Sequence, residues 1–376
     1  MYKHDVKKIG GWMPASKQKQ KEWVNGLIKH IQYSNDTQDG EVEFRHEEVA
    51  QLKHLIENDM EIYILTNQMI AQGLDYDKED PVGAPEIKDY KMMLKLIDYI
   101  LSTAPEYMQP DEKGHSLIGF PINAILDWCM GTPAGFAFFL NEKVNNCFKA
   151  ILDRWCTFLS SEESLYVLNE GNHGWMCESA IKDINIDDFK HSPEDKHWGF
   201  KSWNDFFIRQ FKDGKRIIAE PDNPKVIVSA CESAPYNISK DVQKSQEFWL
   251  KGQPYSLENM MAKDEYVDEF IGGTVYQAFL CATNYHRWHS PVSGVIKKAY
   301  LVPGTYYSEI HSIPYDSAGP NNSQGYITHV AARAIIFIES DDPVIGLMCF
   351  IAVGMAEVSS CKITVNVGDR INKGEE

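Results

Sequence analysis

The chain has 376 residues, and its 37 Lys and Arg against 54 Asp and Glu give a formal net charge of −17 at pH 7. This acidic balance excludes a protein that binds nucleic acid or anionic lipid mainly through charge. With 43% hydrophobic and 24% charged residues the composition is that of a globular protein, which excludes a disordered chain, and the length favours two domains.

The first half of the sequence is predicted to be helical. From Trp12 to about Leu168 the apolar residues recur mostly at helical spacing, for example at Trp23, Leu27, Ile28 and Ile31. The segment Asp183–Lys196 is polar, contains a proline and carries several carboxylates, which indicates a linker. These features predict a helical N-terminal domain over residues 1–195 and a second domain over 196–376.

The second half is predicted to be rich in β-strands. Short β-branched runs separated by Gly, Pro and Asn indicate strands. They begin at Val226, Thr274, Ala334, Leu347 and Ile363. The expected fold class is therefore α+β, with a helical domain followed by a barrel-like or sandwich-like β domain. The loop at residues 311–326 has the composition of an ordered or gating segment, which we expect near the functional site.

Targeting signals are not apparent in the sequence. The charged N-terminus is followed by no apolar segment typical of a secretory signal, so the expected compartment is the cytoplasm. The longest apolar stretch, Val344–Ala356, has 13 residues and is too short to cross a bilayer, so we expect a buried core strand there. The eight scattered cysteines form no Cys-x-x-Cys pair and are expected to be reduced.

The densest polar cluster is at residues 284–291, Asn-Tyr-His-Arg-Trp-His-Ser-Pro. His286 and His289 could supply a base near neutral pH and a group that holds a carboxylate. On a helical turn the two side chains would share a face, whereas on a strand or an irregular turn they would diverge. Two alternatives stay open: ordinary loop histidines, or a metal site completed by Cys281, although a further ligand at suitable spacing is missing.

A second cluster surrounds Glu232, which ends the predicted strand that begins at Val226. A carboxylate at the end of a buried strand can orient a histidine, although an exposed turn residue is the more common role for such a glutamate. The aromatic residues of the stretch 199–211 are interpreted as packing, with Ser202 capping a short helix. Dinucleotide-binding, Walker, nucleophile-elbow and zinc-protease motifs are missing from the sequence.

At these clusters the sequence resembles the phosphatidylserine decarboxylase family. The matching pieces are Trp-Asn-Asp-Phe-Phe-Ile-Arg-Gln-Phe at 203–211, Val-Ser-Ala-Cys-Glu-Ser at 228–233, Tyr-His-Arg-Trp-His-Ser-Pro-Val-Ser-Gly at 285–294 and Val-Gly-Met-Ala-Glu-Val-Ser-Ser at 353–360. Pieces of the first half, including Gly11-Trp12 and residues 131–138, are similar to a branch with a helical extension that decarboxylates tryptophan.

The resemblance implies a self-cleaving proenzyme. Family members cut themselves at a serine near the C-terminus, which becomes a pyruvoyl group on the small α chain and forms a Schiff base with the substrate amine. By position, His289 matches the base for self-cleavage and His286 the histidine of decarboxylation. Glu232 matches the aspartate that pairs with the base, and the change to glutamate puts that pairing in doubt.

The resemblance also implies that the cleavage site follows this sequence. The family's Gly-Ser-Ser or Gly-Ser-Thr motif lies shortly after a glycine turn that here ends at Glu376, so the chain corresponds to the large β chain and Ser359-Ser360 is not the cleavage site. The expected partners are the small α chain and an amino-acid substrate, with nucleic acid excluded and a membrane disfavoured. The pattern indicates no oligomeric state.

The function expected from this resemblance is pyruvoyl-dependent decarboxylation of a soluble aromatic L-amino acid, with tryptophan favoured. Phosphatidylserine decarboxylation, which makes phosphatidylethanolamine, is the first alternative. A non-enzymatic homologue is the second, and it would apply if the gene itself supplied no pyruvoyl serine.

Overall fold

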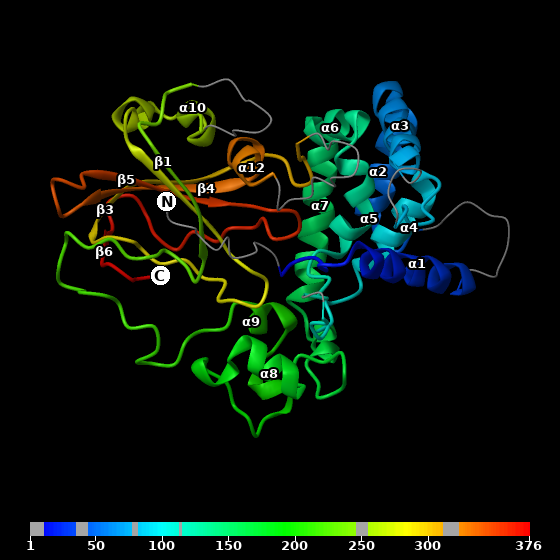
Figure 1. Cartoon of the computed structure of the whole chain (residues 1–376), viewed down its shortest axis with the longest axis horizontal. Coiled ribbons are helices and arrows are strands. Elements are labelled where there is room, and N and C mark those ends of the chain that lie inside the picture. The colour runs from blue at the N-terminus through cyan, green and yellow to red at the C-terminus, as the bar shows by residue number, and fades with distance from the viewer. Residues whose placement is uncertain (1–10, 35–43, 77–81, 113–114, 246–254, 311–322) are drawn as a thin grey trace.

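The computed structural model describes residues 11–34, 44–76, 82–112, 115–245, 255–310 and 323–376. Helices dominate the described chain up to residue 207 and strands from residue 234 onward, which confirms the predicted α+β class. In Figure 1 the helices α1–α7 lie on one side of the molecule and the sheet on the other, with α8 and α9 beneath the junction. We call these two parts the helical half and the β half.

The helical half is built from amphipathic helices with defined starts. Its elements are α1 (Lys17–Ser34), α2 (Glu47–Asn58), α3 (Met60–Tyr76), α4 (Tyr90–Ile100), α5 (Pro121–Met130), α6 (Pro133–Leu140), α7 (Glu142–Leu159), α8 (Glu178–Ile184) and α9 (Trp203–Phe207). The side chains of Asp89, Thr132 and Asn141 cap α4, α6 and α7 by accepting hydrogen bonds from first-turn N–H groups. A Cβ at Gly135 would lie 1.9 Å from the Cys129 carbonyl oxygen, so glycine allows α6 to start tightly against α5.

The β half contains an antiparallel sheet with the strand order β5-β4-β3-β6 and a separate pair, β1 with β2. The strands are β1 (Ala234–Lys240), β2 (Thr274–Phe279), β3 (Gly294–Val302), β4 (Arg333–Ser340), β5 (Leu347–Val353) and β6 (Arg370–Ile371). Two helices, α10 (Leu257–Met260) and α12 (Gln324–Val330), accompany them. In Figure 1, α12 lies between the sheet and α6, where the two halves meet.

Three of the five predicted strands are present, and two are not. The runs that begin at Thr274, Ala334 and Leu347 form β2, β4 and β5. Residues 226–228 and 363–367 form no strand. Their side chains largely alternate in burial, as a strand pattern requires, but their backbones pair with no strand of the described sheets. Glu232 therefore precedes β1 rather than ending a strand, which corrects the prediction.

The apolar stretch Val344–Ala356 does contain a strand, but this strand is not fully buried. Residues 347–353 form β5, which lies at the edge of the sheet, and Ala352 is its buried residue while the others are half-buried. Val344 is 91% exposed. The prediction of a buried core strand is therefore wrong for most of this segment, since most of its side chains are half-buried or exposed.

The predicted linker at Asp183–Lys196 is part of the packed structure. It contains the end of α8, and the side chains of Ile184, Ile186 and Phe189 are buried in the large core that also includes residues of both halves. Its many polar residues had indicated an exposed segment. The apolar residues between them, however, point into the core. The boundary between residues 195 and 196 stays a prediction. Of the predicted loop at 311–326, residues 311–322 lie outside the described part, and 324–326 begin α12.

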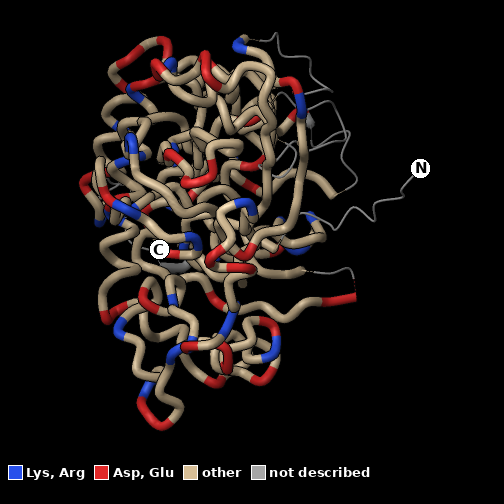
Figure 2. The backbone as a smooth tube through the Cα atoms, turned by 90° about the vertical axis from the view of Figure 1, so that its left-hand side faces the viewer, with Lys and Arg blue, Asp and Glu red and all other residues tan. Residues whose placement is uncertain are grey.

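The acidic excess is spread along the chain. Figure 2 shows Lys and Arg positions scattered among Asp and Glu positions over the described backbone. In the described residues, no helix is both long enough and apolar enough to cross a membrane. The structure contains the eight cysteines without a disulfide among them.

Candidate active site

The segment with the two predicted histidines connects β2 to β3 without regular secondary structure. Because the backbone is irregular here, the two histidines do not share a face, and they contact different neighbours. The ring of His286 packs against Phe207, whereas the ring of His289 packs against Tyr285. Of the two arrangements that the sequence allowed, the structure has the one in which the histidine side chains diverge.

Both ring nitrogens of His289 are engaged. Its Nδ1 lies 2.8 Å from the carbonyl oxygen of Gly374, and its Nε2 lies 2.8 Å from the hydroxyl of Tyr285. Because a carbonyl oxygen can only accept, Nδ1 carries the proton and Nε2 accepts from the phenol. Burial, with a contribution from the negative charge of Glu376, raises the pKa of Tyr285 to about 12, so this phenol stays a neutral donor. Nε2 is therefore the basic atom of His289.

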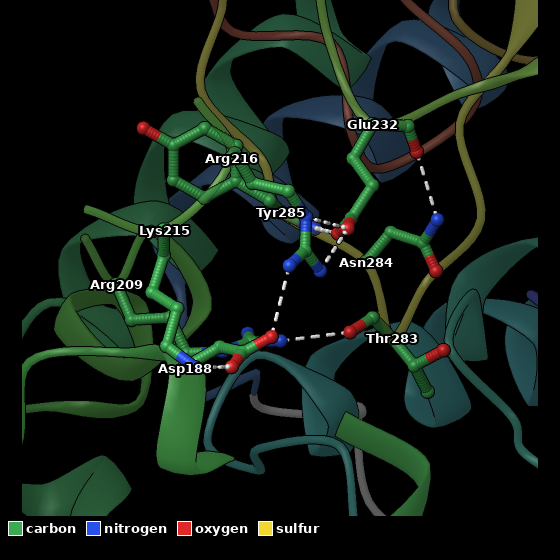
Figure 3. Close-up of polar contacts among 8 residues, drawn as sticks. All are labelled: Asp188, Arg209, Lys215, Arg216, Glu232, Thr283, Asn284 and Tyr285. Carbon is green, nitrogen blue, oxygen red and sulfur yellow. Dashed lines mark hydrogen bonds and ion pairs between the residues drawn. The ribbon is translucent and has the colours of Figure 1, made fainter. Parts of the chain in front are cut away.

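Glu232 is held by an arginine rather than by His289. Arg216 donates from Nε and Nη2 to Oε1 of Glu232, at 2.9 and 2.6 Å, and from Nη1 to Asp188 at 2.9 Å (Figure 3). Lys215 also contacts Asp188, at 2.7 Å. The other carboxylate oxygen of Glu232 accepts from the backbone N–H of Tyr285 at 3.2 Å. The direct pairing of Glu232 with His289 expected from the resemblance is thus not what the structure contains.

The connection between Glu232 and His289 is indirect and passes through Tyr285. The carboxylate fixes the Tyr285 backbone, and the carbonyl of Glu232 accepts from the side chain of Asn284 at 2.8 Å, as Figure 3 shows. The phenol of Tyr285 then contacts His289. Competing hydrogen bonds explain this arrangement. Arg216 offers two donors to Oε1 of Glu232 in a fork geometry, and the hydroxyl of Tyr285 already occupies Nε2 of His289.

His286 lies among aromatic rings. Phe207 stacks on it at 4.1 Å between centroids, Trp12 meets it edge-on at 5.3 Å, and its Nε2 lies 3.1 Å from the carbonyl oxygen of Cys281. Burial, with the positive charge of Arg209 adding to it, lowers the pKa of His286 to about 3. His286 is therefore a neutral imidazole at physiological pH, in surroundings that are mostly apolar.

Several residues of this site were not identified from the sequence. Trp12 lies far away in the chain, and it is anchored by its Nε1, which donates to the Leu280 carbonyl at 2.8 Å. A Cβ at Gly119 would lie 3.0 Å from the Trp12 ring, so this glycine makes room for it. Arg216 and Tyr285 were also missed as partners. Tyr285 stands beside the histidines in sequence, and this adjacency was the available signal.

The two cavities described differ in their relation to these residues. One of about 80 Å³ includes His289 and Glu376 and lies against β3, β4 and β5, and its volume is below that of ordinary ligand pockets. The other, of about 580 Å³, lies between α1 and the segments 108–118 and 172–173, and contains none of the predicted site residues. Among the described residues no group of three or more His, Cys, Asp or Glu is placed to hold a metal ion.

Comparison with known proteins identifies the family. Sequence models described as phosphatidylserine decarboxylase match residues 46–184 and 203–376. The decarboxylase iboD of Amanita muscaria (strain Koide BX008) is 38% identical over 305 residues, which cover 75% of this chain and 87% of that protein. The chain belongs to the phosphatidylserine decarboxylase family. It is a decarboxylase, as the resemblance implied.

Further relatives differ in how much of this decarboxylase they match. The L-tryptophan decarboxylase of Psilocybe cubensis is 35% identical over 316 residues, covering 77% of this chain and 70% of the relative. The phosphatidylserine decarboxylase proenzyme 3 of Schizosaccharomyces pombe is 30% identical over 180 residues, covering 47% of this chain and 17% of the relative. The word proenzyme indicates that such relatives are made as precursors that are processed.

On the expectation that this decarboxylase is made as a self-cleaving precursor, replacement of Tyr285 by phenylalanine should slow its cleavage about 10-fold. The ring, which packs against Phe211, would stay, while the hydrogen bond to Nε2 of His289 would be lost. Gel analysis of the precursor after a timed induction measures the effect. Tyr166→Phe is the control, because that hydroxyl contacts the Ala104 backbone, away from the histidines. Equal rates for both variants would contradict a role for the Tyr285 hydroxyl.

Glu357 links the two halves of the decarboxylase. It lies just after β5, and its Oε1 accepts hydrogen bonds from the first-turn N–H groups of Ile122 and Asn123 in α5, at 2.6 and 2.8 Å. Phe120 precedes α5 and provides no side-chain cap, so the cap comes from the β half. Burial outweighs these hydrogen bonds and raises the pKa of Glu357 to about 8.

This raised pKa predicts a dependence of stability on pH. The folded protein keeps the proton of Glu357 above the ordinary glutamate pKa of 4.5. The contribution of this proton to the free energy of unfolding is therefore fully present below pH 4.5 and is lost as the pH rises through about 8. The loss is on the order of a few kcal/mol. We expect Glu357→Gln to reduce the fall in unfolding free energy between pH 5 and pH 8, measured by urea titration. A fall in the Glu357→Gln variant as steep as in the wild type would contradict this. Glu178→Gln, on the exposed face of α8, is the control and should keep the wild-type fall.

Proposed function

We propose that this decarboxylase acts on a soluble aromatic L-amino acid, with tryptophan favoured, and that it releases carbon dioxide and the corresponding amine. The observation that carries the proposal is the extent of similarity. The match to the L-tryptophan decarboxylase of Psilocybe cubensis covers 77% of the chain, which must include much of the helical half, whereas the match to the fission-yeast phosphatidylserine decarboxylase proenzyme covers 47%. The higher identity and the longer match favour a function related to the first protein, while the helical half alone does not discriminate, because a model described as phosphatidylserine decarboxylase matches residues 46–184.

We further propose that the chain is the large β chain of a self-cleaving precursor whose small α chain carries a pyruvoyl group. That group would supply the electron-withdrawing carbonyl needed for loss of carbon dioxide. The fit of the described residues supports this. The backbone of Ser290 exchanges hydrogen bonds with Glu375 and Gly374, at 2.7 and 2.8 Å, so the segment just before the expected cleavage site lies against His289.

In this proposal each histidine has a distinct role. Nε2 of His289 takes the proton of the cleaving serine through the Tyr285 hydroxyl, which donates to Nε2, and Gly374 holds the opposite nitrogen so that the ring keeps one tautomer. His286 stays neutral and forms part of the apolar surface near the substrate carboxylate. A carboxylate that leaves water for such surroundings loses solvation, and its loss as neutral carbon dioxide is then favoured.

A substrate panel tests the proposal. Protein from the complete reading frame would be assayed for carbon dioxide release from tryptophan, tyrosine, phenylalanine and short-chain phosphatidylserine. We expect turnover of tryptophan at least 10-fold above that of phosphatidylserine. Turnover of the lipid without turnover of any amino acid would reject the proposed substrate and support the alternative, phosphatidylserine decarboxylation.

The intact mass of the denatured protein tests the precursor. We expect a large fragment that ends after Glu376 and a small fragment whose N-terminus is blocked by pyruvoyl. A single uncut species with full decarboxylase activity would contradict the proposed cofactor and the roles given to His289 and the α chain.

A further inference from the structure

Arg287 stands between the two histidines in the sequence, and its side chain makes two contacts that the roles above leave unused. Its Nε donates to the carbonyl oxygen of Ile208 at 2.6 Å, and its Nη1 donates to the carboxylate of Glu376. The exposed fraction of the Arg287 side chain is 22%, so most of it is enclosed. A guanidinium is planar and offers its donors in fixed directions, so these two contacts set the positions of two distant segments relative to each other.

The contact with Ile208 holds the end of α9 beside His286. The last carbonyls of a helix have no partner within the helix, and Ile208 is the residue that caps α9 at its C-terminus. An arginine side chain can satisfy such a carbonyl. Phe207, the last residue of α9, stacks on the ring of His286 at 4.1 Å between centroids. By fixing Ile208, Arg287 therefore also fixes the ring against which His286 packs.

A second arginine makes the same kind of contact in the opposite direction. Nη2 of Arg209, just after α9, donates to the carbonyl oxygen of Thr283 at 2.7 Å (Figure 3). The segments 206–209 and 283–287 are thus joined by one guanidinium from each side. Loss of Arg287 would leave the Arg209 contact in place, so we expect the two segments to loosen locally without separating.

The contact with Glu376 acts on the turn that faces His289. Gly374 in this turn accepts from Nδ1 of His289 at 2.8 Å. The turn is fixed at Lys373, a buried residue whose Nζ donates to three backbone carbonyls of residues 220–226 at 2.6 to 3.1 Å. Glu376 stands two residues after Gly374, and its ion pair with the arginine restricts the movement of this end of the turn.

The charges of the ion pair also act on Tyr285, whose hydroxyl donates to His289. Burial raises the pKa of Tyr285 to about 12, the negative charge of Glu376 adds to this effect, and the positive charge of Arg287 opposes it. Because the two charges are paired, their effects on the phenol oppose each other. Removal of one would leave the other uncompensated near the group that contacts the base.

We propose that Arg287 is a positioning residue that holds His286 and His289 in their working geometries together, by tying the end of α9 to the turn that leads to Glu376. This inference rests on the proposed function, in which His289 serves self-cleavage and His286 serves decarboxylation. Partly exposed ion pairs contribute little to stability, so we expect their loss to change the rates of the two reactions rather than the fold.

Cleavage of the full-length precursor tests the pairing with Glu376. We expect Glu376→Gln to slow cleavage at least 5-fold and Arg287→Gln at least 10-fold, measured by intact mass as the ratio of precursor to large fragment over time. The double variant should cleave as slowly as Arg287→Gln alone, because the contact with Glu376 is already lost there. Arg287→Lys, which keeps a cation for Glu376, should cleave at least 3-fold faster than Arg287→Gln.

Asp341→Asn is the control for these variants. It breaks another arginine–carboxylate pair of the β half, the pair with Arg370, which contacts neither histidine, and it should cleave at the wild-type rate. If Glu376→Gln cleaves as fast as this control, or if the two single effects multiply in the double variant, the inference is overturned. A wild-type precursor that stays uncut would instead reject the proposed function, and this inference with it.

Turnover by the processed enzyme tests the contact with Ile208. Carbon dioxide release is expressed per cleaved molecule, so that slow cleavage does not enter the comparison. We expect kcat to fall at least 5-fold in Arg287→Gln with a smaller change in KM, and to fall less in Glu376→Gln, which keeps the bond to Ile208. A wild-type kcat in processed Arg287→Gln would overturn the role at His286. If Arg287→Gln does not fold, the cleavage rates of Glu376→Gln and Asp341→Asn decide the matter.

Discussion

Replacement of His289 by alanine is expected to leave the full-length precursor uncut. Nε2 is the basic atom of this ring, because Nδ1 carries the proton that it donates to the Gly374 carbonyl, and Nε2 accepts from Tyr285. General-base catalysis contributes about 10²- to 10⁴-fold in enzymes, so the cleavage rate should fall at least 100-fold. The measurement is the ratio of precursor to large fragment over time, by intact mass.

The controls for this variant separate chemistry from folding. His54→Ala on the exposed surface of α2 should cleave at the wild-type rate. Glu232→Gln should slow cleavage about 10-fold, which is less than His289→Ala, because Glu232 acts on His289 through Tyr285 rather than directly. A His289→Ala precursor that splits normally would show that another group is the base.

Replacement of His286 by alanine should have the opposite pattern, with normal cleavage and poor turnover. The ring forms the surface between Phe207 and Trp12, and its loss would admit water to an apolar region. We expect kcat to fall at least 100-fold with a smaller change in KM, measured by carbon dioxide release from the processed enzyme. His286→Ala protein that is processed and keeps its kcat would contradict this role.

The state of His286 also predicts the pH profile. Because its pKa is about 3, the ring is neutral throughout pH 5 to 9, so its titration contributes no inflection in that range. His286→Gln, which keeps a donor for the Cys281 carbonyl, should retain more activity than His286→Ala and the same profile shape. An inflection near neutral pH that disappears in the glutamine variant would show that His286 titrates during turnover.

The class of fold and the central histidines could be predicted because they depend on local sequence. Helical periodicity and β-branched runs record the burial of neighbouring positions, and the histidines stand together in one short segment. The strands that failed, at 226–228 and 363–367, have the right pattern but no partner in the described ladders. Strand formation requires such a partner, and a local pattern does not specify one.

The partners of the predicted residues could not be found because they come from distant parts of the chain. Arg216 reaches Glu232 from a turn with positive φ, and Glu357 reaches α5 across the boundary between the halves. A single sequence contains no record of which side chains meet in this way. The same limit explains why the linker prediction was wrong. The sequence shows the polar residues of 183–196, but it does not show that Phe189 packs into the core.

The position of Trp12 restricts how this enzyme could be recombined with its relatives. Its ring contacts His286, its Nε1 is bonded to the Leu280 carbonyl, and its packing requires the small size of Gly119. A chimaera that joined the helical half of another family member to this β half would replace the side chain that packs against His286. Residues 12, 119, 280 and 286 therefore pack as one unit, and exchange of the helical half alters the surroundings of His286 itself.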